Sequence, residues 1–70
     1  MSNLFEYKLL RLRIREVFEN EGKFADAIGM SKQGVSNKLN GKTGFSQDDI
    51  VHWCNVLHIG NEDIARYFFA

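Results

Sequence analysis

The sequence predicts an all-α fold, a compact bundle of five short helices. Apolar residues recur three and four positions apart, as on the buried face of a helix, and no stretch shows the strict alternation of a strand. Proline, which interrupts helices, is absent. Glycines and capping residues divide the 70 residues into short segments. A chain of this length forms one domain, so we expect a single helical domain over residues 1–70.

The first helix is predicted over residues 5–19. Its inward face follows the three-and-four spacing and consists of Tyr7, Leu10, Ile14, Val17 and Phe18. Three arginines are spread around the helix axis, namely Arg11, Arg13 and Arg15. Charged side chains distributed in this way are typical of a solvated surface, and one of the three is available to contact a phosphate.

Two short helices follow and meet at a glycine. Asn20 can cap a helix that ends at Gly29, and Ser31 can cap the next helix, predicted over residues 31–40. The buried positions of the pair are Phe24, Ala25, Ile28, Met30, Val35 and Leu39. Glycine adopts a left-handed conformation at little steric cost, so we expect Gly29 to turn the chain sharply. The second helix then protrudes, and its polar side carries Gln33, Asn37 and Asn40.

The remaining residues predict two further helices. Ser46 followed by Asp49 resembles a capping box and marks the start of a fourth helix, which Gly60 is expected to end. The inner face of that helix consists of Ile50, Trp53, Cys54 and Leu57. The segment Asn61-Glu62-Asp63 favours the start of a last helix that runs through Ile64 and Phe68.

Several classes of function are disfavoured. No apolar run approaches the roughly 20 residues that span a bilayer, and no secretory signal is present, so we expect a cytoplasmic protein without a membrane partner. The single cysteine, Cys54, is expected in the core. His52 points away from Cys54 and His58, so we expect no metal and no cofactor. No catalytic constellation has a workable spacing, so we expect neither an enzyme nor a small-molecule substrate.

Charge is unevenly distributed, although the formal net charge is zero. Residues 31–44 contain Lys32, Lys38 and Lys42 and no acidic residue. Residues 45–70 contain four acidic residues against the single basic residue Arg66. DNA binding requires local positive charge, which residues 31–44 provide, whereas the zero net charge disfavours tight independent binding.

The middle of the chain resembles a known family. The segments Phe24–Ser31, Gly34–Ser36 and Asn40–Gly41 resemble the helix-turn-helix of phage repressor and Cro-type regulators, with a recognition unit over residues 20–41. The whole helix order is similar to the repressor-like DNA-binding domain of that family. One departure is Glu21, because a glutamine that reaches a phosphate commonly opens the supporting helix, and a carboxylate there repels DNA.

The resemblance implies a set of DNA-contacting residues. Lys32, Gln33 and Asn37 correspond to positions that meet base edges, with Ser36 nearby. Gln and Asn amides can pair with adenine, and Lys can donate to guanine. Asn40 and Lys42 resemble phosphate contacts, and Lys38 is a further candidate. The alternative interpretation of all these residues is an ordinary solvated helix face.

Two functions are therefore compared. The main hypothesis is a sequence-specific transcriptional regulator that binds a symmetric double-stranded DNA operator as a homodimer. The alternative is a modulator or antirepressor of a phage genetic switch that acts by binding a partner repressor protein, which Glu21 and the acidic C-terminal half favour. A DNA-binding fragment of a larger protein is a third, less favoured possibility.

Three aromatic residues at the chain end suggest a partner or dimer surface. Tyr67, Phe68 and Phe69 cannot all point inward from one short helix, so we expect some aromatic area to be exposed there. Fraying of the terminus is the alternative explanation for such exposure.

Overall fold

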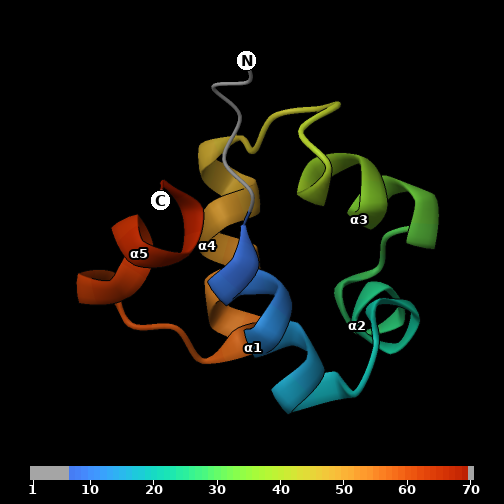
Figure 1. The fold of residues 1–70 in the computed structure, drawn as a ribbon, viewed down its shortest axis with the longest axis horizontal. Coiled ribbons are helices and arrows are strands. Elements are labelled where there is room, and N and C mark those ends of the chain that lie inside the picture. Colours follow the sequence, from blue (N-terminus) through green and yellow to red (C-terminus); the bar gives the residue numbers. More distant parts are fainter. Residues whose placement is uncertain (1–6, 70) are drawn as a thin grey trace.

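The computed structural model describes residues 7–69, and it confirms the predicted all-α fold class. The helices are α1 (Lys8–Phe18), α2 (Glu21–Ile28), α3 (Lys32–Leu39), α4 (Gln47–Leu57), the 3-10 helix η1 (Asn61–Asp63) and α5 (Ile64–Phe68). No strand occurs within residues 7–69. Figure 1 shows α2 and α3 on one side of α1 and α4, and α5 on the other side.

Three helices begin at the capping residues that the sequence predicts. The Asn20 side chain accepts a hydrogen bond from the backbone N–H of Lys23 at 2.8 Å, and Ser31 Oγ accepts one from Gly34 at 3.0 Å. At the start of α4, Ser46 and Asp49 form the reciprocal capping box. These caps satisfy backbone donors that a helix start otherwise leaves without partners. The boundaries of α2, α3 and α4 at their first residues therefore follow from local sequence.

The first helix differs from the prediction at both of its ends. α1 begins at Lys8, because Tyr7 adopts a left-handed conformation with φ of 55°; Phe5, the predicted start, lies outside the described residues. The buried stripe consists of Leu10 and Ile14, with Phe18 partly buried one further turn along. Val17 is 38% exposed, so its predicted inward position is wrong. It lies beside the stripe of residues spaced four apart and not on it.

The fourth helix also ends earlier than predicted. α4 stops at Leu57, and His58, not Gly60, takes the left-handed conformation, with φ of 59°. Both His58 and Ile59 donate their backbone N–H groups to the Cys54 carbonyl, which turns the chain and buries Ile59 at 8% exposure. Gly60 is extended and precedes η1, so the last helical segment opens with a 3-10 turn. Burial of Ile59 thus accounts for the shorter helix.

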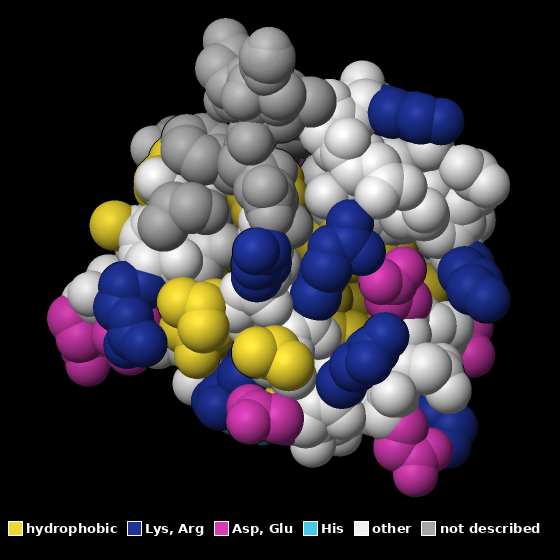
Figure 2. Space-filling model, viewed as in Figure 1, with side chains coloured by type: hydrophobic (Ala, Val, Ile, Leu, Met, Phe, Trp, Pro, Cys, Tyr) yellow, Lys and Arg dark blue, Asp and Glu magenta, His cyan; other side chains and the backbone are white. Residues whose placement is uncertain are grey.

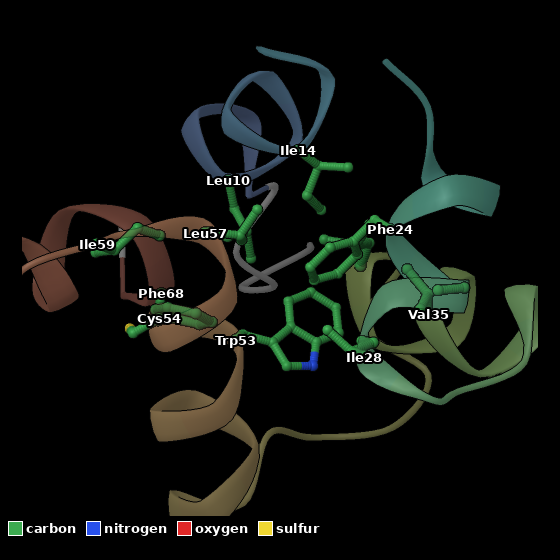
Figure 3. Packing of buried hydrophobic residues seen from close by; sticks show 12 residues of the cluster. Leu10, Ile14, Phe24, Ile28, Val35, Trp53, Cys54, Leu57, Ile59 and Phe68 are labelled. Atoms are coloured by element: carbon green, nitrogen blue, oxygen red, sulfur yellow. The ribbon is translucent and has the colours of Figure 1, made fainter. Parts of the chain in front are cut away.

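Aromatic rings fill the centre of the core (Figure 3). Trp53 of α4 is fully buried and lies in T-shaped contact with Phe24 of α2, with ring centroids 4.7 Å apart. Phe45, in the loop before α4, contacts Trp53 at 4.8 Å and Phe68 of α5 at 5.1 Å. Edge-to-face pairs of this kind are favourable beyond the area they bury. Phe45 therefore connects α4 and α5 through their aromatic side chains.

An arginine of α1 donates hydrogen bonds to carbonyl groups at the C-terminal end of α4. Arg13 donates from Nε to the Leu57 carbonyl at 2.9 Å and from Nη2 to the His58 carbonyl at 3.0 Å. These carbonyls have no partner within the helix, and the positive charge also opposes the negative end of the helix dipole. Arg13 is thus a structural contact between α1 and α4, whereas the sequence predicted a solvated side chain.

Candidate functional site

The helix-turn-helix unit has the predicted bend. Gly29 is left-handed with φ of 75°, and it donates its N–H to the Asp26 carbonyl at the end of α2. Met30 follows and donates to the Ala25 carbonyl at 3.0 Å. α3 is held against the core by Val35 and Leu39, both buried. The outer side of α3 is consequently available to another molecule.

The predicted base-reading residues share this outer side, but they differ in exposure. Lys32 and Gln33 are exposed, whereas Ser36 and Asn37 are half-buried. Gln33 Nε2 donates a hydrogen bond to Asn37 Oδ1 at 2.9 Å. The two amides therefore bind one another, and a base would have to replace or extend this contact. The structure thus brings the four residues together on one side of α3.

The Asn40 side chain is held by neighbouring residues. Its Oδ1 accepts from Arg11 Nη2 at 2.8 Å, and its Nδ2 donates to Ser36 Oγ at 3.2 Å. Arg11 also donates to the Leu39 carbonyl at 3.0 Å, so it fastens the end of α3 to α1. A phosphate at Asn40 would compete with these contacts. Lys42, the other predicted phosphate contact, is exposed in the loop after α3.

Lys38, a further candidate for a phosphate contact, is already engaged by groups of its own chain. Its side chain is only 14% exposed and lies 2.8 Å from the carboxylate of Asp49. It also donates to the Gly44 carbonyl and lies 5.6 Å from the Phe45 ring centroid. The hydrogen bond from Lys38 and that from the Ser46 backbone hold the pKa of Asp49 below its usual value. Sequence reasoning missed this pair because its partners come from different helices.

Glu21 contributes to a mixed-charge pocket at the start of α2. Its carboxylate lies 3.3 Å from Arg11 Nη1, so Arg11 partly neutralises it. The pocket has a volume of about 350 Å³ and is lined by Arg15, Glu19, Asn20, Glu21 and Lys32. Two basic and two acidic side chains line the same space. A pocket of this composition is less suited to a phosphate than a purely basic one.

Gly34 lies close to the two residues that precede α3. A Cβ atom at this position would lie 3.2 Å from both Met30 Cε and Ser31 Oγ. Alanine is favoured over glycine inside a helix by about 0.5–1 kcal/mol, but an alanine here would crowd the side chains of Met30 and Ser31. The group that lies close to Gly34 is therefore the turn between α2 and α3 of the same chain.

The aromatic chain end divides into buried and exposed parts. Phe68 is only 2% exposed and belongs to the core, so its assignment to a partner surface is wrong. It faces inward because α5 places its ring against Phe45. Phe69 is 55% exposed, and Tyr67 is half-buried beside the guanidinium of Arg66. Phe69 and part of Tyr67 therefore remain as exposed aromatic area.

The other sites considered in the sequence have plain structural descriptions. Cys54 is buried, and loss of solvent raises the pKa of its thiol, as expected for a core residue. His52 Nε2 lies 3.1 Å from the Ile28 carbonyl and joins α4 to the end of α2. Over residues 7–69, no group of three or more His, Cys, Asp or Glu side chains is placed to hold a metal ion. In the same residues no helix is long and apolar enough to cross a membrane.

Together these features define a small all-α domain with a helix-turn-helix unit and a charged, amide-bearing α3. The chain belongs to the family described as protein of unknown function (DUF739), whose model matches residues 1–70. It is similar to the solution structure of the modulator of repression (MOR) of the temperate bacteriophage TP901-1 from Lactococcus lactis. That similarity has a TM-score of 0.87 and 36% sequence identity, and covers 99% of this chain and 93% of that one. A comparison with curated proteins found no match.

Proposed function

We propose that this chain is a regulator of a phage genetic switch and that it acts as a modulator by binding a partner repressor protein. The observation that carries the proposal is the similarity to a phage modulator of repression, at 36% identity over 99% of the chain. A likeness over the whole chain supports a shared role better than a shared fold alone does. The alternative considered from the sequence is thus favoured over direct operator binding.

The charge arrangement supports the same choice. The net charge is zero, and two basic residues in or beside α3 already have acidic partners, Lys38 with Asp49 and Arg11 with Glu21. Tight DNA binding depends on cations that are free to replace the counterions of phosphates. This charge arrangement therefore favours a protein partner over DNA.

Titration of this chain into the purified repressor of the same phage tests the proposal. We expect saturable binding, measured as heat in a calorimeter, with no DNA present. Absence of binding at low salt would contradict the proposal. The exposed Phe69 and the half-buried Tyr67 are proposed to contribute to a partner surface, and Phe69→Ser tests the exposed ring without removing the buried Phe68.

Operator binding by a homodimer is the second candidate, and the exposure of Lys32 and Gln33 on α3 favours it. In this case the chain alone would retard a symmetric DNA site from its own phage, with the helix at residues 31–40 in the major groove. Alanine at Lys32, Gln33 or Asn37 would weaken specific binding, each lost base contact costing about 1–3 kcal/mol. Alanine at Lys42 would weaken specific and non-specific binding equally. A mobility shift at low salt separates the two candidates.

A further inference from the structure

The outward side of α4 forms a continuous stripe that no other part of the described chain covers. Gln47, Asp48, Val51 and Asn55 are all exposed, and each of the other three lies three or four residues from Val51, on the same side of the helix. Trp53 and Leu57 face the opposite way into the core. Val51 is 57% exposed and lies between the polar members, so the stripe has an apolar centre and a polar edge. We call these four residues the α4 stripe.

The α4 stripe lies in the acidic part of the molecule. Residues 43–65 contain four acidic residues and no lysine or arginine. Asp49 is paired with Lys38 and Asp63 with Arg66, whereas the carboxylate of Asp48 forms no ion pair within residues 7–69. Its negative charge is therefore available to a partner. Two polar amides, Gln47 and Asn55, can donate or accept hydrogen bonds at either end of the stripe.

The opposite charge gathers on α1. This helix contains four basic residues and one acidic residue, and it also carries the exposed side chains of Leu9, Leu12 and Val17. Figure 2, viewed from the side of α1, shows exposed hydrophobic side chains with Lys and Arg around them. The molecule thus offers two exposed apolar areas with opposite surroundings, one basic on α1 and one acidic on α4.

We infer that the α4 stripe docks against the positively charged DNA-reading surface of the partner repressor. This inference rests on the proposed function and specifies the surface that performs it. A surface that binds operator DNA must present lysine or arginine to the phosphates, and Asp48 complements such charges. The basic residues around Leu12 would repel the same surface. The apolar centre at Val51 with its polar edge matches the usual arrangement of an interface.

Docking of this kind prevents the repressor from binding operator DNA and this chain at the same time. The α4 stripe occupies side chains that otherwise contact phosphates and base edges, so the repressor cannot hold operator and modulator together. Because the attraction is electrostatic, added salt weakens the complex.

Two matched pairs of variants test the inference by repressor titration. Val51→Ser is compared with Leu12→Ser, since their side chains are 57% and 56% exposed. Asp48→Lys is compared with Asp26→Lys, since both are exposed helical acids without an ion pair within residues 7–69. We expect Val51→Ser and Asp48→Lys to weaken repressor binding about tenfold. The two controls should change it by less than about twofold. Circular dichroism verifies that each variant is folded.

The outcomes distinguish this inference from the proposed function. If the unmodified chain does not bind repressor, the proposed function fails and the inference with it. If it binds, but Leu12→Ser weakens binding and Val51→Ser does not, the interface lies on α1 and the inference is overturned. Equal binding by all four variants overturns it too. An amide chemical-shift map of the unmodified chain provides a second measurement, in which added repressor must perturb residues 47–55.

Discussion

Single residues fix the turn that lets α3 protrude. Gly29 has φ of 75°, where a side chain is strained, and no atom lies within 4 Å of the position that a Cβ would take. We therefore expect Gly29→Ala to lower the free energy of unfolding by about 1 kcal/mol through backbone strain alone. Urea unfolding followed by fluorescence of the only tryptophan, Trp53, measures it. Gly44→Ala is the control, because Gly44 has equal space and no strained φ, and an equal loss in both variants would contradict the explanation.

The Lys38–Asp49 pair predicts a pH dependence. The pKa of Asp49 is lowered in the folded protein, chiefly by the Lys38 hydrogen bond, so its carboxylate stabilises the fold above the unfolded value of 3.8. That contribution is lost as the pH falls through the lower, folded pKa. Asp49→Asn should therefore cost about 1 kcal/mol at pH 7 and progressively less below the unfolded pKa.

The exposed pair of Asp63 and Arg66 serves as the comparison for that measurement. Their side chains are 38% and 62% exposed, so Asp63→Asn should change stability by at most about 0.5 kcal/mol. Unfolding curves of the unmodified chain, Asp49→Asn and Asp63→Asn at pH 7 and pH 3 give the changes in the free energy of unfolding. A cost for Asp49→Asn that stays constant over this pH range would show that the ion pair is not its origin.

At the scale of elements, the loop between α3 and α4 holds neighbouring elements together by packing an aromatic side chain against them. Phe45 contacts Trp53 of α4 and Phe68 of α5, and its ring centroid lies 5.4 Å from that of Tyr7 before α1. We expect Phe45→Ala to cost about 3 kcal/mol, since it removes three aromatic contacts from a small core. Thermal unfolding monitored by circular dichroism measures the loss. Leu12→Ala, at an exposed position, should cost less than about 0.5 kcal/mol, and a similar cost for Phe45→Ala would mean that the loop does not join the elements.

Element boundaries were predictable where they depend on neighbours in sequence. The caps at Asn20, Ser31 and Ser46 and the bend at Gly29 each need only a few consecutive residues. The early end of α4 was not predictable, because it depends on burial of Ile59 against distant residues. The inward position of Phe68 likewise depends on Phe45.

In the candidate site, too, some features could be predicted from sequence neighbours and others depend on distant residues. Exposure of Gln33 follows from helical periodicity, which places it opposite Val35 and Leu39. Lys32 and Lys42 are exposed because they lie at the first residue of α3 and in the loop after it. The engagement of Lys38 by Asp49 and of Asn40 by Arg11 could not be read from spacing, since each pair joins residues from different segments. Because of these contacts, the side chains of Lys38 and Asn40 are less available to the DNA that the resemblance predicts on this side of the domain.

At the scale of the whole molecule, charge is distributed unevenly along the chain. α1 contains four basic residues and one acidic residue, whereas residues 43–65 contain four acidic residues and no lysine or arginine. A molecule with this arrangement can be attracted to a basic repressor surface while its total charge remains zero. The helix-turn-helix fold is thus compatible with a role that does not require DNA contact.

Fluorescence anisotropy of a labelled operator held by the repressor tests the central claim most directly. Addition of this chain should lower the anisotropy to that of free DNA, and the chain alone should not raise the anisotropy of free operator. A further rise on addition to the repressor complex, or specific binding by the chain alone, would contradict the account of a modulator that binds the repressor in place of its operator.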